Sequence, residues 1–153
     1  MINGGKGKTM SRTQDARENF KKGFSCSQAV LAAVSQPLGL DREKALKIAQ
    51  AFGGGMARMG LTCGAVTGAM LAIGLKHGRT RPEDEESKER TYRLVHELVR
   101  RFQDRHGSIV CRELIGVDLS TPEGHKLGAE KGVFESLCPQ FVSDAVEILE
   151  EIL

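Results

Sequence analysis

The chain is poor in aromatic residues: it has no tryptophan, one tyrosine and six phenylalanines among 153 residues. It also lacks a strong excess of charge, because 22 basic residues stand against 20 acidic ones and the net charge at pH 7 is +2. Nucleic-acid binding usually needs a basic patch, and single strands are held by aromatic stacking as well. The composition therefore gives no reason to expect a nucleic-acid partner.

Long apolar runs are absent too. The longest, residues 61–75, is interrupted by three glycines and is too short to cross a bilayer. The chain opens with a polar, glycine-rich segment instead of a leader with an apolar centre. We therefore expect no membrane insertion and a cytoplasmic location, where cysteines are more often ligands or redox groups than structural disulfides.

The familiar cysteine motifs are missing as well. No Cys-x-x-Cys pair of the kind found in zinc fingers, ferredoxins or thioredoxins occurs, and no Cys-x-x-Cys-His for covalent haem. Covalent haem is therefore excluded. If the cysteines bind a metal, an iron–sulfur cluster and zinc both stay open, and the ligands must converge through the tertiary fold.

Helical periodicity, by contrast, is present along almost the whole chain. Apolar residues recur at helical spacing, and the two-residue alternation of half-buried strands is nearly absent. With 40% hydrophobic and 27% charged residues, the composition is typical of one globular domain. We expect an all-α, single-domain multi-helix bundle over residues 11–153, preceded by a disordered tail at residues 1–10.

Start signals recur just ahead of the periodic segments. They place helix starts at Ser11, Asp41, Thr62, Pro82 and Ser108. The helix that follows Pro82 is expected to be long and to end at His106. There the negative end of the helix dipole would stabilise a partly charged imidazole. The final helix is expected to begin at residues 138–139 and to carry an apolar stripe.

All four cysteines fall where a helix is expected to begin: Cys26, Cys63, Cys111 and Cys138. Free N–H groups and the positive end of the dipole favour thiolate over thiol at such positions, and Arg112 adds a charge beside Cys111. We therefore expect lowered thiol pKa values and a sulfur-centred site formed by all four residues. The alternative is that they are buried small hydrophobes without a chemical role.

Small residues follow Cys63 at intervals of one helical turn: Gly64, Gly68 and Ala72. A glycine inside a helix costs about 1 kcal/mol relative to alanine, so two on one face need a reason. A cofactor groove would make Gly64 and Gly68 cofactor-binding residues. A seam for helix packing or for a homodimer is the other explanation, and glycines in helices more often reflect packing.

A second glycine cluster, residues 53–55, is followed by Arg58. It fits either an anion-binding loop or a helix C-cap and hinge. The histidines show no ligand spacing on one helix face, and His125 lies in a loop-like stretch.

Five segments together carry a family resemblance. They are Phe24-Ser-Cys-Ser-Gln-Ala-Val30, Phe52-Gly-Gly-Gly55, Cys63-Gly-Ala-Val-Thr-Gly68, Cys111-Arg-Glu-Leu114 and Cys138. In this order they resemble the C_GCAxxG_C_C family, small proteins described as redox-active and named after this pattern. The resemblance implies an all-helical domain with the four cysteines as its functional signature, and it brings no settled reaction or cofactor.

The leading hypothesis is a small redox protein. Its four cysteines would act as thiol/disulfide pairs or hold an iron–sulfur centre, which makes the chain either a thiol-based oxidoreductase or an electron carrier. The alternative is a non-redox protein that binds zinc or another soft metal through four thiolates. The sequence names neither a substrate nor a redox partner.

Overall fold

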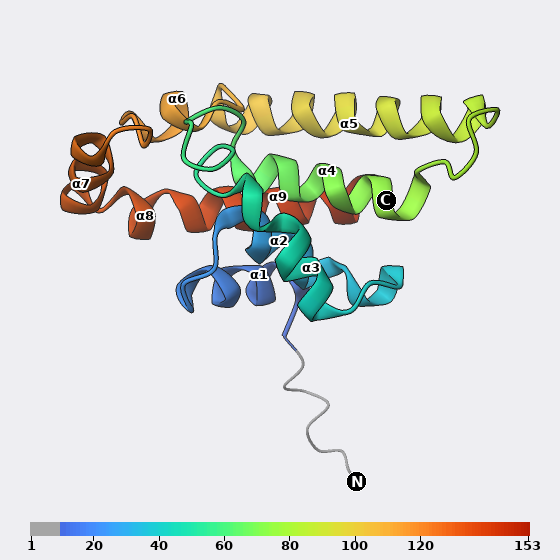
Figure 1. The fold of residues 1–153 in the computed structure, drawn as a ribbon, viewed down its shortest axis with the longest axis horizontal. Helices are drawn as coiled ribbons and strands as arrows, with labels where there is room; N and C mark the ends of the chain where they lie inside the picture. Colours follow the sequence, from blue (N-terminus) through green and yellow to red (C-terminus); the bar gives the residue numbers. More distant parts are fainter. Residues whose placement is uncertain (1–9) are drawn as a thin grey trace, which may run out of the picture.

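In the computed structural model, which describes residues 10–153, helices follow one another with short connections and no strand occurs (Figure 1). The expected all-α, single-domain fold is confirmed, while the expected tail lies almost wholly outside the described residues. The α-helices are α1 (Arg12–Lys21), α2 (Cys26–Val34), α3 (Arg42–Ala49), α4 (Gly64–His77), α5 (Glu85–His106), α6 (Cys111–Ile115), α7 (Pro122–Lys131), α8 (Val133–Ser136) and α9 (Cys138–Ile152). Two short 3-10 helices are η2 (Gln36–Leu38) and η3 (Gln50–Phe52).

Side-chain caps set the starts of several helices. Ser11 Oγ accepts a hydrogen bond from the Gln14 N–H at 3.2 Å, and the Ser11 N–H donates to Gln14 Oε1 at 3.0 Å. Asp41 likewise accepts from the Lys44 N–H at 2.9 Å. These bonds, reciprocal at Ser11 and single at Asp41, satisfy N–H groups that the first helical turn leaves free, so both predicted starts are confirmed.

Three predicted starts, at Thr62, Pro82 and Ser108, are wrong by a few residues; for Ser108 the N-cap is Val110 instead. Thr62 forms an isolated antiparallel bridge with Val110, so Cys63 takes the N-cap position of α4. Pro82 precedes α5 without joining it, because Asp84 caps that helix by accepting from the Ser87 N–H at 3.0 Å. The start expected at Thr62 is displaced by a contact with a residue distant in the chain, and the start expected at Pro82 is displaced by a neighbouring cap.

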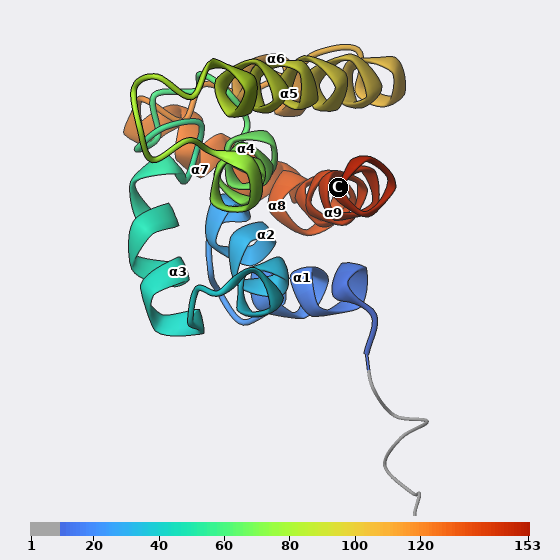
Figure 2. The same cartoon turned by 90° about the vertical axis from the view of Figure 1, so that its right-hand side faces the viewer.

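The helices form layers around α2. Helices α4 and α9 lie between α5 on one side and α1 to α3 on the other (Figures 1 and 2). Helix α2 packs against α1, α3, α4 and α9, and α5 packs against α4 and α9. Helices α6, α7 and α8 gather at one end of the bundle (Figure 1). The apolar stripe of α9, with Val142 and Val146 fully buried, is confirmed.

The small-residue ridge of α4 is a packing seam against α2. A Cβ atom added at Gly68 would lie 2.8 Å from the Ser27 carbonyl oxygen, and one added at Gly64 would lie 3.0 Å from the Ser27 nitrogen. The two helix backbones can approach this closely only because the side chains are missing. The seam also draws the start of α4 toward the start of α2, where Cys26 lies.

A buried carboxylate joins three helices near the start of α9. His106 Nε2 lies 2.7 Å from Asp144 Oδ2, Gln140 donates to Asp144 Oδ1 at 2.8 Å, and Arg17 donates to Gln140 Oε1 at 2.9 Å. The His106 side chain is only 13% exposed. Its role is therefore to bind Asp144, beyond the dipole contact expected from sequence, and the network fixes the first turns of α9.

Within residues 10–153, none of the helices combines the length and the apolar character needed to span a membrane.

Candidate functional site

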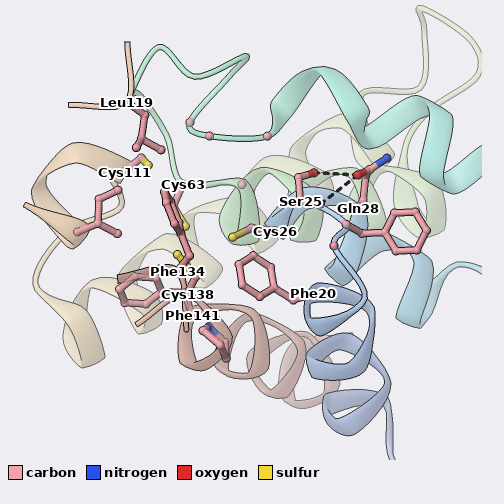
Figure 3. Close-up of a pocket in the computed structure, with 18 of the residues that line it drawn as sticks. Phe20, Ser25, Cys26, Gln28, Cys63, Cys111, Leu119, Phe134, Cys138 and Phe141 are labelled. Atoms are coloured by element: carbon pink, nitrogen blue, oxygen red, sulfur yellow. Dashed lines mark hydrogen bonds between the residues drawn. The ribbon is translucent and has the colours of Figure 1, made fainter. Parts of the chain in front are cut away.

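The four cysteines line one open cavity of about 1360 Å³ at the end of the bundle where α6, α7 and α8 gather (Figure 3). All four are free thiols. Cys63, Cys111 and Cys138 are 4%, 8% and 7% exposed, and Cys26 is partly exposed. Residues far apart in the chain thus meet at one solvent-connected space.

Each cysteine reaches the cavity from the start of a helix. Cys26, Cys111 and Cys138 are the first residues of α2, α6 and α9, and Cys63 is the N-cap of α4. The positions predicted from sequence are therefore confirmed. A helix start puts these side chains at one end of the bundle, and Figure 3 shows the Cys26 sulfur directed toward the space beside Cys63 and Cys138.

Cys26 and Cys138 form one pair. The proximity of the Cys138 thiol, followed by burial, raises the pKa of Cys26 well above its ordinary value. The proximity of Cys26 lowers the pKa of Cys138. Since a thiol that donates to a neighbouring thiolate stabilises it, the pair loses its first proton more readily from Cys138.

The antiparallel bridge brings Cys63 and Cys111 together as a second pair. The Cys63 N–H donates to the Ile109 carbonyl at 2.7 Å, and the Cys111 N–H donates to the Leu61 carbonyl. Each cysteine directly follows a bridged residue, so both side chains point to the same face of the bridge as diagonal neighbours. Ser108, expected to cap the helix here, instead accepts from the Val110 N–H at 2.9 Å.

Burial corrects the expectation that every helix start lowers a thiol pKa. It raises the pKa of Cys63 to about 12, although the N–H groups of Ala65 and Val66 act in the opposite direction. Burial and then the charge of Cys138 raise the pKa of Cys111 to about 11, and Arg112 does not offset this. The helix-start effect is present but is smaller than the cost of desolvating a thiolate.

Phenylalanines from three parts of the chain also line the cavity: Phe20, Phe24, Phe134 and Phe141. His125 of α7 also lines the cavity, with its ring centroid 5.5 Å from that of Phe134. These residues could not be predicted as cavity residues, because they lie in different segments of the chain and share no pattern of spacing. The expectation that His125 lies in a loop is wrong, since the residue is helical.

A strained turn borders the cavity beside the cysteines. Gly54, Gly55, Met56, Ala57 and Arg58 have successive φ values of 69°, 70°, 68°, 52° and 66°. This left-handed turn costs about 1–2 kcal/mol for each residue that carries a Cβ. A Cβ added at Gly55 would lie 2.7 Å from the Cβ of Cys111. The glycine cluster therefore lets the turn close against a cysteine.

The arrangement does not gather the ligands of a single metal ion. Among residues 10–153, no three histidine, cysteine, aspartate or glutamate side chains lie close enough together to share one ion. Gly64 lines the cavity beside Cys26 and Cys63, whereas Gly68 lies in the seam against α2.

Comparison with known proteins places the sequence of this chain in a family. No curated protein and no solved structure gives a significant match to the chain. A family model described as "Putative redox-active protein (C_GCAxxG_C_C)" matches residues 24–152, which is nearly the whole chain and includes every cysteine. The chain therefore belongs to the C_GCAxxG_C_C family.

Proposed function

We propose that the chain is a redox protein in which Cys26, Cys63, Cys111 and Cys138 form one centre, with Cys26 and Cys138 as the exchanging dithiol. The observation that carries the proposal is that both thiols line one open cavity, where each acts on the other and their pKa values shift in opposite directions. A thiol/disulfide couple needs one readily ionised thiol and a second thiol within reach of it.

The exchange has two steps. The Cys138 thiolate attacks one sulfur of a disulfide RS–SR, whose S–S bond breaks, and the departing RS⁻ takes up a proton from water. Cys26 then loses its proton and attacks the Cys138 sulfur of the mixed disulfide, which releases the second RSH. The chain is oxidised by two electrons to a Cys26–Cys138 disulfide, and RS–SR is reduced to two thiols.

Cys63 and Cys111 have a different part in this scheme. With pKa values of about 12 and 11, both remain protonated near neutral pH and are poor nucleophiles there. Both thiols line the same cavity as the reacting pair. Their charges, if formed, would raise the pKa of Cys26 further.

A second redox function is favoured by the grouping of the cysteines into two pairs. A [2Fe–2S] cluster is held by four cysteine thiolates divided between two irons, so it does not need three ligands around one ion. Cys26 with Cys138 and Cys63 with Cys111 supply such a division. Bound iron would also compensate the thiolate charges that now raise one another's pKa values. The structure offers no comparable support for a single zinc ion.

Anaerobic purification tests both functions on one sample through the absorption spectrum, iron and sulfide analysis, and thiol counting. The dithiol function predicts four free thiols after reduction, two after mild oxidation, and a Cys26–Cys138 crosslink. The cluster function predicts visible absorption, with two irons and two sulfides per chain. Stoichiometric zinc, or four thiols that stay free after oxidation without iron, would overturn the proposal.

Cys111→Ser provides a matched control because it removes a cavity thiol outside the exchanging pair. The dithiol function predicts that this variant still forms the Cys26–Cys138 crosslink. Cys138→Ser should form none.

A further inference from the structure

We infer that the cysteine cavity takes a low-molecular-weight disulfide bearing a carboxylate, and that Arg58 binds this carboxylate. The inference rests on the proposed dithiol function and names the substrate class of the same site. The disulfide is itself the two-electron oxidant and leaves as two thiols.

The depth of the cavity favours a small substrate. The cysteines that line it are mostly buried, yet the cavity is open to solvent and has a volume of about 1360 Å³. Cavities of about 300–1,000 Å³ enclose drug-sized ligands, so a small disulfide can enter fully. A disulfide on the surface of a folded protein would have to be carried to the same depth by a long, narrow projection.

The excess of cationic over acidic side chains around the cavity favours an anionic substrate. Arg17, Lys21 and Arg58 line it against two carboxylates, Glu18 and Glu135. Arg17 donates to Gln140, Lys21 lies 4.0 Å from Glu18, and the charge of Glu135 raises the pKa of Cys138. The guanidinium of Arg58 is exposed and forms no hydrogen bond or ion pair with the residues that the structure describes. Residues 1–9 contain no aspartate or glutamate that could pair with it.

The left-handed turn fixes Arg58 relative to the cysteines. A Cβ at Gly54 would lie 2.9 Å from Cγ of Arg58, so the arginine stem folds back over a bare glycine. On the other side of the turn, Gly55 contacts Cys111. The Arg58 N–H also donates to the Gly53 carbonyl at 3.0 Å. Because both ends of the turn are held, the base of the guanidinium arm has a defined position at the cavity edge.

An arginine placed in this way suits a carboxylate. Its planar fork of N–H donors matches two carboxylate oxygens, and charge-assisted hydrogen bonds are about twice as strong as neutral ones. The phenylalanine walls would enclose the apolar part of the substrate. Cys26 and Cys138 line the same cavity as Arg58, so one substrate can meet all three.

The test compares two disulfides as oxidants of the reduced chain. Glutathione disulfide carries carboxylates, and hydroxyethyl disulfide is neutral. The inference predicts that Arg58→Gln slows oxidation by glutathione disulfide about tenfold, the loss expected for one charge-assisted hydrogen bond. The rate with hydroxyethyl disulfide should not change. Arg58→Lys should retain part of the rate with glutathione disulfide because it keeps the positive charge.

Arg93→Gln is the matched control. Arg93 is also exposed and forms no ion pair with any described residue, but it lies on α5 and does not line the cysteine cavity. This variant should react like the wild type with both probes. Equal rates for wild type and Arg58→Gln with glutathione disulfide, or an equal loss with both probes, would overturn the inference. Failure of the wild-type chain to react with either disulfide would overturn the proposed dithiol function instead.

Discussion

Cys63 lies at the start of α4 and is nearly inaccessible to solvent, so two opposing effects act on one thiol. Burial dominates and raises its pKa from 9.0 to about 12. The folded chain therefore keeps this proton more tightly than the unfolded chain. The resulting stabilisation is fully present below pH 9 and is lost as the pH rises toward 12.

This linkage predicts that the melting temperature falls between pH 9 and pH 11 under reducing conditions. Part of the fall should disappear in Cys63→Ala, which removes the titrating group. Thermal unfolding followed by circular dichroism at a series of pH values measures both slopes. An identical slope in the variant would show that Cys63 does not contribute.

Cys138 presents the reverse case, since its contact with Cys26 lowers its pKa. Cys26→Ala removes this contact, so the pKa of Cys138 should rise and its alkylation by iodoacetamide at neutral pH should slow severalfold. Mass spectrometry of the Cys138 peptide over time gives the rate. Cys111→Ala is the control, because Cys111 does not contribute to this shift and its removal should leave the rate unchanged. Equal rates in all three proteins would contradict the pairing.

At the scale of helices, the seam between α2 and α4 determines how closely their first turns approach. Gly68→Ala would place a Cβ 2.8 Å from the Ser27 carbonyl oxygen, which only a backbone shift can relieve. We expect a loss of about 1–3 kcal/mol in the free energy of unfolding. Urea denaturation of the reduced chain measures it.

Gly74→Ala is the matched variant in the same helix, because nothing lies within 4 Å of a Cβ added there. It should stabilise the chain by about 0.5–1 kcal/mol through helix propensity and the unfolded state. If both variants changed the unfolding free energy alike, the seam would not be tightly packed.

The left-handed turn allows a similar comparison of glycines. Gly55 and Gly39 both have positive φ values, but a Cβ at Gly55 would meet Cys111, whereas a Cβ at Gly39 has open space. Gly55→Ala should therefore cost about 1–3 kcal/mol more than Gly39→Ala. It should also alter the alkylation rate of Cys111, which Gly39→Ala should leave unchanged. Equal unfolding free energies would contradict the close contact between the turn and Cys111.

At the scale of the whole molecule, local signals predicted the helices and could not predict the cavity. Caps such as Ser11 and Asp41 bind N–H groups within one helical turn, so the cap and its partner can both be recognised in the sequence. The bridge at Thr62 depends on Val110, which is distant in the chain, and it displaced the start of α4. Tertiary contacts of this kind decide element boundaries that propensity alone leaves open.

The same distinction applies to the cysteines. Their positions at helix starts followed from neighbouring residues, but their pKa values depend on burial and on which thiols meet. The contact between Cys26 and Cys138 joins the second helix of the chain to the last. No spacing rule predicts it, and none predicts the phenylalanine walls or the position of Arg58 at the cavity edge.

The most direct test of the four-cysteine redox centre is an anaerobic redox titration in which mass spectrometry maps the state of every cysteine. A dithiol centre should give one reversible two-electron step that crosslinks Cys26 to Cys138 while Cys63 and Cys111 stay free to alkylate after unfolding. An iron–sulfur absorption that changes with potential would instead identify the cluster form of the same centre. Four thiols that remain free throughout, in a chain without iron, would show that the cysteines form no redox centre.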